Sequence, residues 1–164
     1  MFCGRHVCDR QKWGRLVGPT KRGKGTKLVV LADGAGAPLG VCVASASPSE
    51  VKLLEPTLNN ACFVVGKQPQ RLIADRGYDS NAVRAFLVAR GIDPIIPARR
   101  KNRAATHQDG RKLRRYGHRW IVERTHSWLQ GFRRLVVRYE RSATVFLGLV
   151  HIACALVTLR RVLG

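Results

Sequence analysis

Acidic residues are scarce in this chain, which has 10 Asp and Glu but 30 Lys and Arg among 164 residues. The resulting net charge of +20 is unevenly distributed. Residues 1–27 hold eight basic side chains and one acid, residues 28–98 hold six of each, and residues 99–164 hold sixteen and three. A neutral centre between basic flanks is typical of a protein that presents basic surfaces to a polyanion. The alternative is a merely solvated basic face, but solubility does not require so much charge, so we expect a nucleic-acid partner.

The chain also lacks the cysteine pairs of metal-binding or disulfide-rich proteins and the long apolar segment of a membrane protein. Its five cysteines show neither metal-ligand spacing nor a dense disulfide pattern, which indicates reduced thiols in a cytoplasmic protein. No signal peptide opens the sequence. The longest apolar run, VFLGLVHIACALVTL, is interrupted by His151 and is shorter than the ~20 residues of a membrane span. We therefore expect a core-facing terminal helix and no membrane partner.

The apolar content of 45% predicts one globular domain of alternating strands and helices. TKLVVLADGAGAPLGVCVASA indicates two strands joined in a hairpin at DGAG, and SPSEVKLLEPTL a short helix capped by Ser47 or Ser49. The next three segments indicate a buried strand, a helix from Ser80 to Gly91 and a brief strand: RLIADRGYDS, SNAVRAFLVARGI and DPIIP. Strand, helix and strand in this order predict a right-handed parallel crossover and therefore an α/β fold. Two helices, near 116–138 and 143–163, complete the chain.

Two acids are candidates for metal-dependent chemistry. Asp75 follows a predicted strand, at the sheet edge where ligand sites of open α/β proteins gather. Glu123 lies in the basic segment YGHRWIVERTHSWLQGFRRLVVRYER. Each has a simpler explanation, since Asp75 could start a turn with Gly77 and Glu123 could pair with Arg119. A hard divalent cation nevertheless needs carboxylates from separate elements, and two such ions about 4 Å apart can drive phosphodiester cleavage.

The helical spacing around Glu123 predicts a polar stripe beside an apolar face. Arg119, Glu123, His126 and Gln130 recur at intervals of three and four, and Tyr116 precedes Arg119 by three residues. We expect the opposite face to enter the core, through Trp120, Trp128, Phe132 and Leu135. A stripe of Tyr, Arg and Glu could hold a phosphate while the Glu binds metal.

These motifs resemble those of DDE-type bacterial insertion-sequence transposases. Tyr116-x2-Arg119-x3-Glu123 is similar to the first part of their Y-x2-R-x3-E-x6-K signature. IADRGYDS resembles the segment with their second catalytic Asp, FRRLVVRYERS the stretch after their Glu, and VGPTKRGKGTKLVVLADGAGAPLG their second and third strands. The resemblance runs from about Val17 to the C-terminus.

The resemblance implies an RNase H-like mixed sheet flanked by helices, Mg²⁺ (or Mn²⁺) as cofactor, and cutting and joining of DNA at element ends. It implies that Asp75 and Glu123 are catalytic metal ligands and that Arg119 and Tyr116 contact phosphate or DNA. Partners are then the element ends and target DNA, with a homodimer or an upstream-frame product as further possibilities. The residues expected to bind DNA are Lys21, Arg22, Lys24, Arg99, Arg100, Lys101, Arg103, Arg111, Lys112, Arg114, Arg115, Arg119 and Gln130.

The sequence departs from the family pattern in two places. Gln130 stands where the signature has its final Lys, which weakens the expected DNA contact. The first catalytic Asp is missing, because CGRHVCDRQKWGRLVG replaces a strand of the type V-D-G-T/S-Y/F-x-x-A-K-x-G-G. Asp9 lies outside such a strand by its sequence and Asp33 lies in the predicted hairpin turn, so neither is a convincing substitute.

The genetic code suggests an origin for this gap. With CGN arginine codons, reading one nucleotide later lets Cys3–Gly4 encode Val, Gly4–Arg5 encode Asp and Arg5–His6 encode Gly. Continued to Arg15, the shifted frame can spell VDGTYATAKNGGD, although the degeneracy of several codons also allows coincidence. Our hypothesis is that residues 1–16 are out of frame and that residues 17–164 form a partial catalytic domain.

We then expect the sheet to lack its first, central strand and transposition to be impaired. The alternatives are a non-catalytic DNA-binding fragment that could inhibit the full enzyme, and a small basic RNA-associated protein. The latter is disfavoured because the aromatic residues have core spacing rather than that of a stacking platform.

Overall fold

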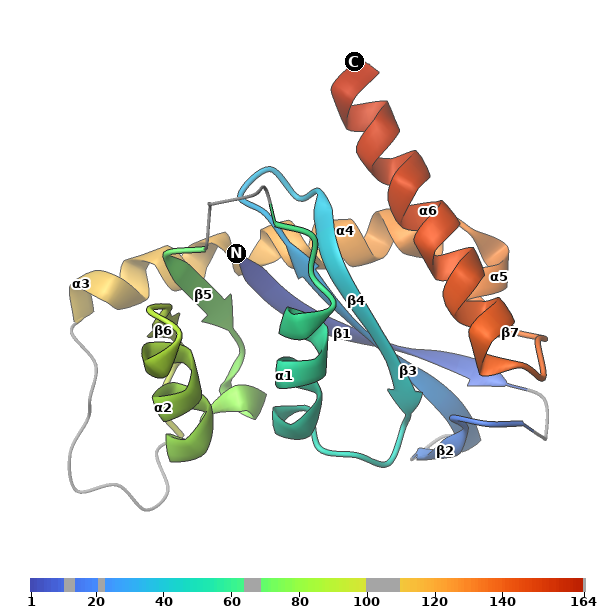
Figure 1. Cartoon of the computed structure of the whole chain (residues 1–164), viewed down its shortest axis with the longest axis horizontal. Coiled ribbons are helices and arrows are strands. Elements are labelled where there is room, and N and C mark those ends of the chain that lie inside the picture. The colour runs from blue at the N-terminus through green and yellow to red at the C-terminus, as the bar shows by residue number, and fades with distance from the viewer. Residues whose placement is uncertain (11–13, 21–22, 64–68, 100–109, 164) are drawn as a thin grey trace.

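The fold is a mixed sheet with helices on both faces (Figure 1). The computed structural model describes residues 1–10, 14–20, 23–63, 69–99 and 110–163, without the side chains of residues 6 and 8–10. The main path of the sheet runs in the order β2-β3-β1-β5-β6, with β4 paired to β3 and β7 paired to β1. The strands are β1 (Phe2–Arg10), β2 (Gly18–Thr20), β3 (Gly23–Ala32), β4 (Pro38–Ser45), β5 (Arg71–Ala74), β6 (Asp93–Ile95) and β7 (Val137–Arg138). This confirms the α/β class and the helix-flanked mixed sheet.

The expectation that the central strand is missing is wrong, because β1 occupies that place. It pairs antiparallel with β3 from Phe2↔Ala32 to Asp9↔Gly25, and parallel with β5 at Phe2↔Ile73 and Cys3↔Ala74. Backbone groups make these pairs, so the strand forms without the side chains of the family's motif. Asp9 therefore lies in a strand after all, at the end of β1 that adjoins β7.

The predicted hairpin and crossover are confirmed. β3 and β4 pair antiparallel from Thr26↔Ser45 to Ala32↔Pro38, around a turn in which Asp33 Oδ1 accepts hydrogen bonds from the amides of Ala35 and Ala37. α2 (Asn81–Ala89) begins with Ser80 Oγ accepting from the Val83 amide and ends before Gly91, whose φ of 70° suits glycine. It connects β5 to β6, which are parallel. α1 (Val51–Asn59) begins after Glu50, without the predicted serine cap.

Two layers of helices cover the sheet. α1 and α2 lie over one face, where Leu31, Leu54, Leu72 and Leu87 form the centre of a buried cluster. The other face carries α4 (Trp120–Gln130), α5 (Arg133–Val136) and α6 (Ala143–Leu163), and Figure 1 shows α4 running behind the strands. The short segment η1 (Arg76–Tyr78) connects β5 to α2, and α3 (Gly110–Leu113) and η2 (Arg114–Arg119) precede α4.

The C-terminal region differs from its prediction in one respect. The single helix expected near 116–138 is divided into η2, α4, α5 and the strand β7, with a break at Gly131 and Phe132. The helix expected near 143–163 is α6, and its buried residues Phe146, Val150, Ala153 and Val157 confirm a core-facing side. By length and composition α6 could cross a membrane, with a mean hydropathy of 1.9 over an 18-residue window that is 22% buried.

Candidate active site

The fold brings Asp75 and Glu123 to one small cavity of about 160 Å³. Asp75 reaches it from the end of β5, Arg119 from the end of η2 and Glu123 from the first turn of α4. The remaining walls are Cys3, Gly4 and Arg5 of β1, Glu50 before α1, Tyr78 of η1, and Val122 and His126 of α4. Residues 48 positions apart in the sequence therefore share one cavity at the edge of two parallel strands.

Asp75 has a structural function as well as its place in the cavity. Its backbone is extended, with φ −75° and ψ 174°, and its Oδ1 accepts a hydrogen bond of 2.6 Å from the Gly77 amide. This is the turn interaction weighed above as the simpler explanation for Asp75. The capped turn directs the chain from β5 into η1 and fixes the carboxylate at the strand end.

Glu123 is paired with Arg119 one turn earlier on the same helical segment. Arg119 Nη2 lies 2.6 Å from Glu123 Oε1, and the side chains are 38% and 56% exposed. The Arg119 guanidinium also lies 5.6 Å from the centre of the Tyr116 ring. These three residues therefore form a contiguous group, in which Arg119 and Glu123 line the cavity and Tyr116 contacts Arg119.

The rest of the predicted stripe and apolar face is rearranged. His126 is buried beside β1, whereas Gln130 is exposed at the end of α4. Trp120 was expected in the core but is 50% exposed, and Trp128 and Phe132 are only partly buried. The core positions of α4 are Ile121, Val122, Thr125, His126 and Leu129. The wrong face was assigned within α4 itself, because Trp120 and Trp128 precede the break at Gly131 and still lie outside its buried set, whereas Leu135 beyond the break is buried as predicted.

Gly4 occupies the position beside Asp75 on the neighbouring strand. The parallel register Phe2↔Ile73 and Cys3↔Ala74, continued by one residue, sets Gly4 next to Asp75. Side chains at paired positions of parallel strands point to the same face of the sheet. A Cβ at Gly4 would lie 3.0 Å from Val122 Cγ2 and from His126 Nε2, so it would point toward α4, which also carries Glu123.

Glu50 is a third acid of the cavity, and sequence reasoning missed it. It forms an ion pair with Arg5, and its side chain is only 11% exposed. Burial raises the pKa of Glu50 above its ordinary value; the charges of Arg5 and Lys27 oppose this shift and that of Asp75 adds to it. No motif marks this residue in the sequence, because it precedes an ordinary helix and enters the site only through the packing of α1 against the sheet.

Cys3 and Tyr78 close the inner wall of the cavity. Cys3 Sγ lies 3.2 Å from the Tyr78 hydroxyl, and both residues are 1% exposed. Burial raises the pKa of the Cys3 thiol to about 12, and burial likewise raises the pKa of Tyr78. Since a thiol with such a pKa is not a nucleophile near neutral pH, these groups are structural.

The acids of the cavity do not assemble a metal site. Among the residues that the structure describes, no group of three His, Cys, Asp or Glu side chains lies close enough to hold a metal ion. Glu123 is paired with Arg119, Glu50 with Arg5, and one oxygen of Asp75 with the Gly77 amide. A divalent cation needs several oxygen ligands from separate elements, so the residues present do not fit a resident Mg²⁺.

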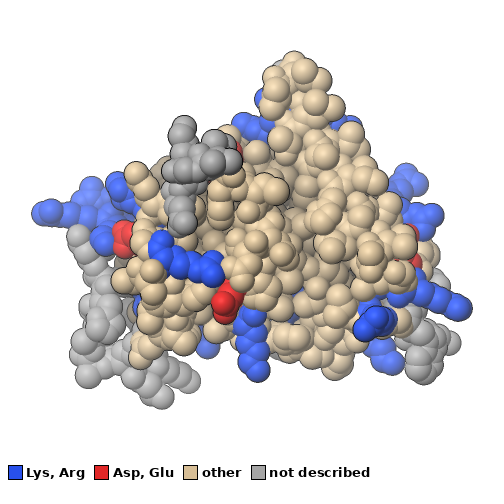
Figure 2. All heavy atoms as spheres, in the orientation of Figure 1, with Lys and Arg blue, Asp and Glu red and all other residues tan. Residues whose placement is uncertain are grey.

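The predicted DNA-binding residues that the structure describes lie near α3 and η2, with two exceptions, Lys24 and Gln130. Arg111, Lys112, Arg114 and Arg115 are exposed on these segments, and Arg99 is exposed while its amide donates to Asp79. Lys24 is exposed on β3, at the other end of the sheet, and Lys21, Arg22, Arg100, Lys101 and Arg103 lie outside the described residues. Figure 2 shows Lys and Arg side chains gathered at the end of the molecule where α3 lies, with few acids on this face.

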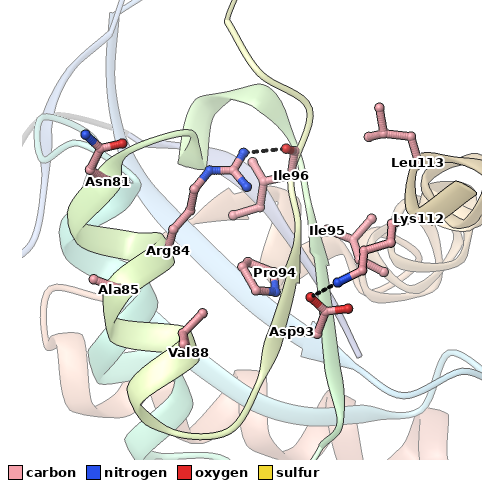
Figure 3. Close-up of a pocket in the computed structure, with 10 residues that line it drawn as sticks. All are labelled: Asn81, Arg84, Ala85, Val88, Asp93, Pro94, Ile95, Ile96, Lys112 and Leu113. Carbon is pink, nitrogen blue, oxygen red and sulfur yellow. Dashed lines mark hydrogen bonds and ion pairs between the residues drawn. The ribbon is translucent and has the colours of Figure 1, made fainter. Parts of the chain in front are cut away.

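A second cavity of about 410 Å³ lies between α2, β6 and α3 (Figure 3). Its charged groups are paired within the chain: Arg84 Nη2 donates to the Ile96 carbonyl at 2.6 Å, and Lys112 Nζ lies 2.9 Å from Asp93 Oδ1. Neither Asp75 nor Glu123 lines it. The smaller cavity, rather than this one, is therefore the candidate active site.

Comparison with known proteins gives consistent matches. The family model described as a transposase DDE domain matches residues 5–158. A protein of Burkholderia cepacia named as a transposase for insertion sequence element IS402 is 36% identical over 170 residues, covering 96% of this chain and 77% of the relative. A protein of Brucella ovis named as a transposase for insertion sequence element IS6501 is 28% identical over 135 residues, covering 82% of this chain and 98% of the relative.

A solved structure supports the fold assignment. The chain is similar to piggyBac transposase in a synaptic complex with hairpin DNA, with a TM-score of 0.63 and 9% identity. The match covers 93% of this chain but spans only 45% of that structure. At this identity the likeness concerns the fold, which agrees with an RNase H-like arrangement of the mixed sheet.

Proposed function

The chain belongs to the DDE transposase family, and on this premise we propose that it binds insertion-sequence DNA while its capacity to cut and join phosphodiester bonds is impaired. The element ends and the target would be its DNA partners, Mg²⁺ or Mn²⁺ the cofactor of the intact enzyme, and the bacterial cytoplasm, at the nucleoid, its location. A homodimer or association with an upstream-frame product would complete the assembly.

The observation that carries this proposal is Gly4 beside Asp75 in the cavity that also contains Glu123. The family resemblance implies three acids, of which Asp75 is the second and Glu123 the third. A strand position that adjoins Asp75 and faces the helix of Glu123 is where a first acid belongs. A glycine there supplies no ligand, and this accounts for the absence of a three-residue metal group among the described side chains.

The same position supports the reading-frame hypothesis. In the shifted frame, the codons of Gly4 and Arg5 permit Asp, and that Asp would replace Gly4. The preceding residue would change from Cys3, which is 1% exposed, to Val, which suits a buried strand. Sequencing the encoding DNA through codons 1–20 tests this. An open shifted frame with Val-Asp-Gly supports a frameshift, and a stop codon there overturns it.

The chain's own side chains still provide a surface for DNA. Arg119 and the exposed basic residues of α3 and η2 lie on one segment that leads to the cavity, and their charge favours contact with phosphates. At the mouth of the cavity, Arg119 would hold a phosphate beside Glu123. Binding of this type weakens steeply with salt, whereas preference for element ends needs additional base contacts.

The decisive experiment restores the acid. Gly4→Asp should bind Mn²⁺ at least about tenfold more tightly than the unaltered chain in titration calorimetry, and should nick element-end DNA. Gly4→Asn is the matched control, with nearly the same shape and no charge. Because a Cβ at position 4 is tight against both His126 and Val122, Gly4→Asp combined with His126→Ala provides a second variant in which one of these two contacts is relieved. The proposal fails if neither Asp variant binds the ion better than the Asn control.

The rival function is a DNA-binding fragment that occupies element ends without catalysis and inhibits the full enzyme. The ion pairs of Glu123 and Glu50 favour it, because they neutralise two of the three acids of the cavity without metal. Glu123→Ala distinguishes the two: it should abolish metal-dependent nicking in a working enzyme and leave DNA affinity nearly unchanged in a pure binder.

A further inference from the structure

A row of apolar side chains on α6 is exposed to solvent. Val145, Ile152, Leu156, Leu159 and Leu163 are 56%, 58%, 40%, 51% and 77% exposed, and Leu149 between them is half-buried. Successive members are separated by four, three, four, three and four residues. This alternation is the heptad repeat of a coiled coil, and we call these six residues the α6 seam.

The seam is distinct from the face of α6 that contributes to the core. Phe146, Val150, Ala153 and Val157 are buried against β3, β4, α4 and α5. The helix thus has two apolar faces, one covered by its own chain and one exposed except at Leu149, which also packs against the core cluster. In Figure 1 the C-terminal end of α6 stands clear of the sheet, which leaves that part of the seam accessible.

The covered face argues against a membrane as the occupant of the seam. A helix that spans a bilayer must present its whole circumference to lipid or to other spanning segments. For α6 that would mean withdrawing Phe146 and Val150, both fully buried, from the core of the domain. Apolar side chains with heptad spacing instead pack against the side chains of another helix that has the same repeat.

We propose that the α6 seam pairs with the α6 seam of a second copy of this chain, in antiparallel orientation. The spacing reads the same in both directions, so an antiparallel pair sets Val145 opposite Leu163, Leu149 opposite Leu159, and Ile152 opposite Leu156. Each copy then offers the same surface to the other, as a two-fold dimer requires. A helix of 21 residues gives a contact about 30 Å long.

The charges of α6 favour this orientation. Arg160 and Arg161 lie in its last turn, and no acid lies between residues 143 and 163. A parallel pair would bring the arginines of both copies together, whereas an antiparallel pair separates them by the length of the helix. Since each copy carries +20, salt should strengthen the dimer while it weakens DNA binding.

This inference names the surface of the homodimer proposed above and is tested without DNA or metal, so it can fail independently of the catalytic proposal. Sedimentation of the unaltered chain should show a dimer that becomes more populated with salt. Ile152→Asp with Leu156→Asp should weaken it at least about a hundredfold. His151→Asp introduces a charge at an exposed position of α6 outside the seam and should leave it intact. All three proteins should have the same thermal unfolding cooperativity.

Cross-linking tests the orientation. Leu149→Cys and Leu159→Cys chains should form a disulfide when mixed but not singly, because only unlike positions lie opposite each other. The unaltered chain, with its own cysteines, supplies the background. A monomer at about 100 µM, or a dimer unaffected by the Asp pair, overturns the proposal. Disulfides within single-variant samples overturn the antiparallel arrangement, and seam-dependent binding to phosphatidylcholine vesicles, without a dimer, assigns the seam to lipid instead.

Discussion

β1 and β5 lie side by side at the centre of the sheet and differ in what they contribute to the site. β5 supplies Leu72 and Ala74 to the core and ends on Asp75. β1 supplies Phe2 and Cys3 to the core but has Gly4 where its neighbour has the acid. The comparison shows that backbone pairing maintains a strand position even where the side chain that chemistry needs is absent.

The largest effect should distinguish the contributions of the two strands to stability. Leu72→Ala in β5 removes a side chain that is 0% exposed and should lower the free energy of unfolding by about 3 kcal/mol. Val7→Ala in β1, at a half-buried position, should cost less than about 1 kcal/mol. Urea unfolding of both variants measures this. Equal losses would show that β1 is as tightly packed as β5.

A smaller effect should separate the turn function of Asp75 from its negative charge. Asp75→Ala removes the acceptor of the Gly77 amide and should destabilise the fold by about 1 kcal/mol. Asp75→Asn keeps an acceptor and should cost less than about 0.5 kcal/mol. In the Gly4→Asp background, Asp75→Asn preserves the turn but removes the charge. If it abolishes the gain in Mn²⁺ affinity, the negative charge of Asp75, and not its hydrogen bond in the turn, is what binds the ion. Calorimetry of these variants provides the measurement.

The pH dependence of stability should report on Glu50. Because burial raises the pKa of Glu50 above its ordinary value of 4.5, the folded chain holds that proton more tightly than the unfolded chain. This stabilisation is present below pH 4.5 and is lost as the pH rises through the folded pKa. Glu50→Gln, which cannot titrate, should therefore gain stability relative to the unaltered chain between pH 4 and pH 7.

Urea unfolding at both pH values checks the expectation for Glu50. Glu55→Gln, at an exposed position of the same helix, is the control and should show no comparable change. An identical pH trend for Glu50→Gln and the unaltered chain would contradict the assigned burial effect.

The smallest effect concerns Glu123. Its pair with Arg119 is largely exposed, so Glu123→Gln should change the free energy of unfolding by less than about 0.5 kcal/mol. DNA affinity should stay the same or rise slightly, because the change frees Arg119 for phosphate. Thermal unfolding and fluorescence anisotropy with element-end DNA measure the two quantities. A large loss of stability would assign Glu123 a structural role.

The sequence predicted those parts of the fold that have strong local signals. The DGAG hairpin and the capped helix from Ser80 to Gly91 depend on turn residues and on one amphipathic period, and both are found. The interval 116–138 was mispredicted as one helix, whereas α4 ends at Gln130 before Gly131 and the chain continues as α5 and β7. Glu50 was missed because its place in the cavity depends on contacts between segments distant in sequence.

By itself, the sequence determined the basic charge, the spacing of Tyr116, Arg119 and Glu123, and the family to which that spacing points. Only the tertiary structure decided that residues 2–10 form the central strand and that Gly4 lies beside Asp75. The physical reason is that charge and helical spacing are properties of neighbouring residues. Strand order and the register of two parallel strands depend on backbone pairing between residues some seventy positions apart in the sequence. No local sequence pattern predicts such pairing.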